Sequence, residues 1–179
     1  MRDDRVIRAA LFAFVGALFF AHWVITDPGY GESTTQSQWR YVLFFSVALL
    51  TLGVAWPVFG RMVGGHWVWR LSLLAGAGAT LSSLANIVED GLRHDWAFFA
   101  FILGSAIGVV ALLALTAVIA FTERGRRRLL ALVPAGVVAG YLLYVAAGGV
   151  IMLTAWLGAA AMAFVLPARI GVQAVAATP

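Results

Sequence analysis

The sequence predicts an all-α polytopic membrane protein, a bundle of six transmembrane helices with the N- and C-termini in the cytoplasm. Of its 179 residues, 63% are hydrophobic and 11% are charged, and the mean hydropathy is +0.95. A soluble domain carries roughly 45–50% apolar and about 25% charged residues. The composition therefore excludes a water-soluble globule, a disordered chain and a protein that binds nucleic acid.

Six apolar stretches approach the roughly 20 residues that a helix needs to cross a bilayer. The predicted helices cover about residues 6–25, 41–59, 67–88, 96–121, 129–147 and 150–166, within a single integral-membrane domain, 1–179. Only Gly148 and Gly149 separate the fifth stretch from the sixth, so that boundary is the least defined. The first stretch is interpreted as a retained anchor, because it is too long for a signal peptide and no small-x-small cleavage site follows.

The placement of arginine predicts the orientation. All twelve basic residues are arginines, and ten of them lie in segments that face one side if the N-terminus is inside. Cytoplasmic loops carry an excess of basic residues, so this side is assigned to the cytoplasm and the protein to the inner (plasma) membrane. The reliance on arginine, with many Ala, Gly and Val residues, is typical of a GC-rich bacterial genome.

Several kinds of chemistry are absent from the sequence. There is no Cys and no Lys, which excludes thiolate metal sites, thiol catalysis and Schiff bases. No phosphate-binding loop, dinucleotide fingerprint, zinc-protease motif or nucleophile elbow occurs. We expect no cofactor and no metal site.

The third predicted helix carries a polar stripe. At about 100° per residue, one narrow face collects Ser72, Gly76, Ala79, Ser83, Asn86 and Asp90. Polar side chains in a membrane-spanning helix avoid lipid. The stripe is therefore expected to face the bundle interior or a wet cavity, and to become charged toward the extracytoplasmic end.

A candidate site follows at that end, because the first helix brings His22 to the same level. The candidate ligand-binding residues are His22, Ser83, Asn86, Glu89, Asp90 and Arg93. If the site is catalytic, Glu89 or Asp90 would donate a proton and His22 or Asp95 would accept it. Simpler explanations stay open: Asp95 as a helix N-cap, Glu89 and Arg93 as a surface pair, and Ser83 and Asn86 as interhelical hydrogen bonds. A metal or haem site at His22 and His94 has the weakest support.

Three functions fit these residues. The favoured one is a non-catalytic protein that binds or transports a small hydrophobic, cationic or lipid-like ligand through an outward-facing polar pocket on helix three. The second is a membrane-embedded acid/base enzyme, such as an isomerase or cyclase, acting on a lipid or isoprenoid. The third is a non-catalytic subunit of a larger membrane complex.

Two further features concern partners. Gly104 and Gly108, and likewise Gly136 and Gly140, have the spacing that lets helices approach closely; the pairs indicate either packing within the bundle or a homo-oligomer seam. The charged run between helices four and five is expected to fix topology and to contact anionic lipid headgroups of the bilayer. Its basic residues are Arg124, Arg126, Arg127 and Arg128.

Overall fold

The computed structural model describes residues 2–25 and 37–166, and within these ranges the chain is helical apart from short turns. The helices are α1 (Arg2–Ile25), α2 (Ser37–Val63), α3 (His66–Asn86), α4 (Ala97–Thr122), α5 (Leu132–Leu142) and α6 (Gly149–Val165). Three short helical segments join them: η1 (Ile87–Gly91), η2 (Gly125–Ala131) and η3 (Tyr144–Gly148). The all-α prediction is confirmed for these residues.

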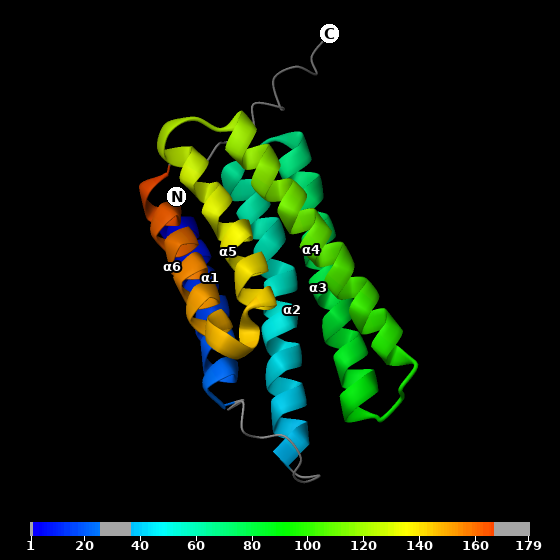
Figure 1. Cartoon of the computed structure of the whole chain (residues 1–179). Helices are drawn as coiled ribbons and strands as arrows, with labels where there is room; N and C mark the ends of the chain where they lie inside the picture. The colour runs from blue at the N-terminus through cyan, green and yellow to red at the C-terminus, as the bar shows by residue number, and fades with distance from the viewer. Residues whose placement is uncertain (1, 26–36, 167–179) are drawn as a thin grey trace.

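The helices form an elongated bundle with α1 and α6 on one side, α3 and α4 on the other, and α2 and α5 between them (Figure 1). The most extensive contacts join α3 to α4, α3 to α2 and α1 to α6. Contacts of α1 with α2 and of α4 with α5 are much sparser. The bundle therefore consists of a layer α2–α3–α4 and a layer α1–α5–α6, which meet along a seam.

Within the described ranges, five helices are long and apolar enough to cross a membrane; they span 4–25, 41–63, 66–91, 97–122 and 146–165. The fifth predicted span, 129–147, is not one continuous α-helix. It begins with the 3₁₀ turn η2, continues as α5 for 11 residues, and ends at the turn residue Leu143.

The break between the last two helices lies at Leu143 instead of at Gly148 and Gly149, which sit inside a continuous helical stretch. Close packing explains these glycines. A β-carbon on Gly149 would collide with Trp23 Cβ, and one on Gly140 would lie 3.0 Å from the Gly148 carbonyl oxygen. The pair permits close helix contact and does not form the turn.

Small residues let α3 pack closely between α2 and α4. A β-carbon on Gly76 would lie 2.6 Å from the Gly53 carbonyl oxygen in α2, and one on Gly78 would lie 2.6 Å from the Gly104 carbonyl oxygen in α4. Pro57, inside α2, lacks the N–H that would otherwise bond to the Gly53 carbonyl. That carbonyl lies directly against Gly76. Of the two interpretations offered for Gly104, packing within the bundle or a homo-oligomer seam, the structure shows the first.

Aromatic rings fill the contact between the two layers. Trp56 of α2 and Trp156 of α6 are fully buried, with ring centroids 4.9 Å apart, and Phe12 of α1 lies 5.5 Å from Trp156. The two tryptophans therefore pack between helices of the two layers. Trp67 and Trp96, at helix ends, are exposed.

The described arginines gather largely at one end of the bundle, the upper end in Figure 1, where α2, α4 and α6 end and α1, α3 and η2 begin. Arg5 donates to the Phe164 carbonyl, and Arg127 donates to the Met62 carbonyl, each at 3.5 Å. Glu89 and Asp90 lie at the opposite end, in η1. The segment 26–36 and the residues after 166, which also entered the orientation argument, lie outside the described residues.

Candidate functional site

The polar stripe of α3 faces inward, but it packs directly against α2. The Ser83 hydroxyl donates to the Ser46 carbonyl at 2.7 Å, and Asn86 Nδ2 donates to Ser46 Oγ at 3.0 Å and to the Val42 carbonyl at 3.4 Å. Ser83, Asn86 and Ser46 are each at most 5% exposed. This part of the stripe joins two helices by hydrogen bonds and lines neither of the two hollows described below.

The charged end of the stripe does not follow the expected face. Beyond Asn86 the helix widens into the π-turn η1, in which Leu92 N–H bonds to the Ile87 carbonyl five residues back at 3.0 Å. Each residue then advances less around the axis than in an α-helix. Asp90 is therefore exposed and Glu89 half-buried, so Asp90 does not face the bundle interior, which was one of the two surroundings predicted for it.

Arg93 follows in the turn to α4. It is exposed and has a φ of +60°, in the left-handed region that most side chains disfavour. His94 and Asp95 are also exposed. These groups stand at the bundle end, and none of them lines either of the two hollows described below.

His22 is buried between α1 and α2. Its ring stacks on Phe45 with centroids 4.8 Å apart and an interplanar angle of 27°, and Phe44 lies 6.4 Å away. The structure thus brings His22, Ser83 and Asn86 to one end of the bundle, against residues 42–46 of α2. Among the described residues no three His, Asp or Glu side chains come together as a potential metal site.

A cavity lies elsewhere, along the seam between the two layers, and every one of the six helices contributes to its wall. Its volume is about 50 Å³, which is room for a few water molecules. The lining is almost wholly apolar and includes Phe19, Leu49, Trp56, Val109, Val137 and Met152.

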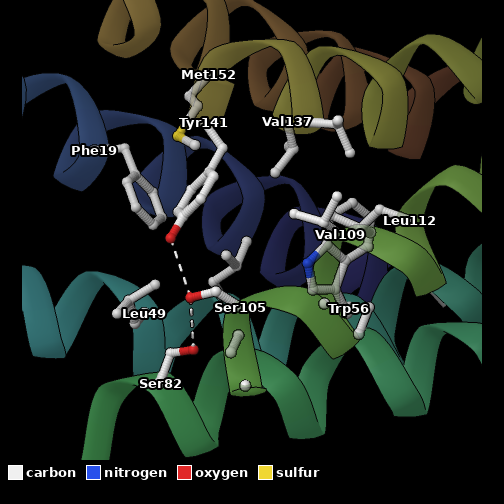
Figure 2. Close-up of a pocket in the computed structure, with 16 residues that line it drawn as sticks. Phe19, Leu49, Trp56, Ser82, Ser105, Val109, Leu112, Val137, Tyr141 and Met152 are labelled. Carbon is white, nitrogen blue, oxygen red and sulfur yellow. Dashed lines mark hydrogen bonds between the residues drawn. The ribbon is translucent and has the colours of Figure 1, made fainter. Parts of the chain in front are cut away.

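Three hydroxyl groups stand out against that apolar wall (Figure 2). Tyr141 of α5 donates to Ser105 Oγ of α4 at 3.0 Å, and Ser105 Oγ lies 3.2 Å from Ser82 Oγ of α3. The Ser82 hydroxyl in turn lies 3.3 Å from the Phe101 carbonyl, which can only accept. The three side chains form a hydrogen-bonded chain, the hydroxyl chain, that crosses the seam from α5 to α3.

The hydroxyl chain has a direction. A hydroxyl has one proton to donate. If Ser82 donates to the Phe101 carbonyl, then Ser105 donates to Ser82 and Tyr141 donates to Ser105. All three hydroxyl protons are then donated. No other member of the hydroxyl chain donates to the Tyr141 oxygen, so this oxygen is its open end. A half-buried oxygen with free lone pairs in an apolar wall favours a partner that brings a donor.

The sequence pattern pointed to neither Ser105 nor Tyr141. Ser105 and Tyr141 lie on different helices, 36 residues apart in sequence, and neither belongs to a periodic polar pattern. Ser82 lies one position before Ser83, about 100° around α3. It therefore faces α4 and the cavity, while Ser83 faces α2.

The arginine run between α4 and α5 is accessible except at one position. Arg124, Arg126 and Arg128 are exposed, whereas Arg127 is half-buried and lies 3.6 Å from Glu123. Glu123 is only 8% exposed. The pair attaches η2 to the end of α4 and leaves the other three guanidinium groups outward.

No family model matches the chain, and no curated protein or solved structure is significantly similar to it.

Proposed function

We propose that the protein is a non-catalytic membrane protein that binds a lipid-like molecule with a hydroxyl group in the cavity between its two helix layers. The hydroxyl of the ligand would donate to the Tyr141 oxygen, and its apolar chain would lie along the seam. The observation that carries this proposal is the hydroxyl chain Tyr141–Ser105–Ser82, in an otherwise apolar wall built by all six helices. The proposal keeps the ligand class expected from the sequence and moves the site from the Asn86 face of α3 to its Ser82 face.

The seam supports ligand entry. At about 50 Å³ the cavity is too small for a lipid chain as it stands, so binding requires the layers to separate locally. The contacts of α1 with α2 and of α4 with α5 are the sparse ones in the bundle. Movement at this boundary disturbs less packing than movement between α3 and either of its neighbours.

The other two functions have less support. The candidate catalytic residues Glu89, Asp90 and His22 do not line the cavity, and Asp90 is exposed. A subunit of a larger complex is expected to expose a small-residue stripe such as Gly104 and Gly108, and Gly104 is instead closed against α3. These placements favour ligand binding over both the enzyme and the subunit.

Photocrosslinking can test the proposal. The full chain in detergent is labelled with a diazirine-bearing hexadecanol and, separately, with the matching hexadecane. Loss of one neutral hydrogen bond costs about 1 kcal/mol, so we expect Tyr141→Phe to lower labelling affinity by about fivefold. Crosslinks should map to α3, α4 and α5.

Thr116→Val provides a matched control, because the Thr116 hydroxyl bonds within α4 to the Leu112 carbonyl and lies outside the cavity lining. It should leave labelling unchanged. Equal labelling by the alcohol and the alkane, or no effect of Tyr141→Phe, would contradict the proposal.

We also propose that the arginine-rich end faces the cytoplasm of a bacterial cell. The support is the gathering of arginine at that end and the positive-inside rule. The chain has no cysteine, so single cysteines at His94 and at Arg126 can be labelled with an impermeant maleimide in spheroplasts. Only the first should react, and the reverse pattern would invert the topology.

A further inference from the structure

A second apolar hollow lies on the outside of the bundle, between α5 and α6. This groove has a volume of about 570 Å³. Its wall includes Leu129, Leu132, Gly136, Thr154, Gly158 and Ala161. Leu129 and Leu132 are 55% and 65% exposed, so in a membrane the groove opens toward the acyl chains of the bilayer.

The groove begins where the arginine run ends. Leu129 directly follows Arg128 and lies three residues after Arg126, within the 3₁₀ turn η2. In a 3₁₀ helix, residues three apart project from the same side. Arg126 therefore stands in line with Leu129, at the mouth of the groove.

The positive charge at this mouth is not balanced by the described part of the chain. Glu123 is turned to Arg127, and no described acidic side chain forms an ion pair with Arg124, Arg126 or Arg128. The pairing of Glu123 with Arg127 and the bond from Arg127 to the Met62 carbonyl hold η2 against the bundle. The groove is thus an apolar channel with fixed cationic groups at one end.

We infer that this groove binds an anionic phospholipid, with one acyl chain between α5 and α6 and the phosphate at Arg126. Guanidinium groups match phosphate oxygens in geometry and charge. A second copy of the chain fits less well. A two-fold axis along the membrane normal would bring the same patch of both subunits together and would set two arginine runs against each other.

Native mass spectrometry of the full chain in detergent tests this site. The chain is titrated with dioleoylphosphatidylglycerol and, separately, with dioleoylphosphatidylcholine. We expect the anionic lipid to bind more tightly. Arg126→Gln should weaken its binding by about fivefold, the effect of one arginine near an anionic surface.

Gly158→Phe tests the acyl channel separately from the charge. No atom lies within 4 Å of a β-carbon built on Gly158, so the ring can enter the groove, and it should lower phosphatidylglycerol affinity with all arginines present.

Leu157→Phe is the matched control, because it adds bulk to an exposed position of α6 outside the groove. Arg70→Gln is the charge control, since it removes an exposed arginine from the same end of the bundle but from α3. Neither control should change binding.

Three outcomes would overturn the inference: equal binding of the two lipids, unchanged binding in Gly158→Phe, or a dimer that Gly158→Phe dissociates. The last would make a second copy the occupant. If Gly158→Phe does not fold, Ala161→Phe blocks the same wall from an exposed position and replaces it.

Discussion

The hairpins α3–α4 and α5–α6 use glycine in different ways. In α3–α4, Gly78 and Gly104 bring two backbones so close that a β-carbon on either would lie within 2.8 Å of the other's carbonyl oxygen. In α5–α6, Gly136 packs against Ala155, but Gly158 has no neighbour and belongs to an open groove. The same residue type therefore closes one interface and leaves a surface hollow in the other. The difference predicts which substitutions unfold the protein and which do not.

The largest effect is expected from Gly104→Leu. The added side chain would meet the Gly78 carbonyl at 2.8 Å and the Ser82 backbone nitrogen at 2.8 Å, and neither atom can move without displacing α3. Overpacking costs typically 1–3 kcal/mol and sometimes more; because backbone is hit, we expect at least about 3 kcal/mol. Thermal unfolding in detergent, followed by tryptophan fluorescence, measures the loss. An unchanged midpoint would contradict the close α3–α4 contact.

Gly76→Leu comes next, and it should destabilise the protein by about 2–3 kcal/mol. Its β-carbon would meet the Gly53 carbonyl oxygen at 2.6 Å and the more yielding Pro57 ring at 3.1 Å. Asp90→Asn is the comparison on the same predicted stripe, and at an exposed position it should change stability by less than about 0.5 kcal/mol. The reverse ranking in thermal unfolding would mean that Gly76 is not at the α2–α3 interface.

The sequence predicted the helical fold and five of the six expected spans because hydropathy and segment length are local properties. It also predicted that Ser83 and Asn86 face inward, since a regular α-helix fixes their direction. It missed the direction of Asp90 because a π-turn changes the rotation per residue, and no residue in 87–91 signals that turn. It misplaced the α5–α6 break because glycine serves both turns and close contacts.

The cavity was beyond a sequence argument. Tyr141, Ser105 and Ser82 come from three helices, and each is an ordinary residue in its own helix. Only the packing of the two layers brings their hydroxyls together. By contrast, the arginine run was visible at once, and what the structure adds is the apolar groove that starts beside it.

A smaller effect should come from the hydrogen bond between Asn86 and Ser46, which lies at the α2–α3 interface. Asn86→Ala loses its bonds to Ser46 Oγ and the Val42 carbonyl and should cost about 1–2 kcal/mol. A double-mutant cycle with Ser46→Ala isolates the side-chain pair. Coupling energies between polar side chains in membrane proteins average about 0.6 and reach about 1.7 kcal/mol. A coupling of zero would show that burial of Asn86, and not this bond, is what the interface requires.

The smallest effect on stability is expected from Gly158→Leu, the α5–α6 counterpart of Gly104→Leu in α3–α4. A β-carbon at Gly158 meets nothing within 4 Å, so the substitution creates no clash. Leu also has a higher helix propensity than Gly by up to about 1 kcal/mol, which acts in the stabilising direction. We expect the unfolding midpoint to stay the same or to rise slightly, in the same assay in which Gly104→Leu lowers it. A loss comparable to that of Gly104→Leu would mean that α6 is covered at Gly158 in the membrane, and that the groove is an interface between protein surfaces.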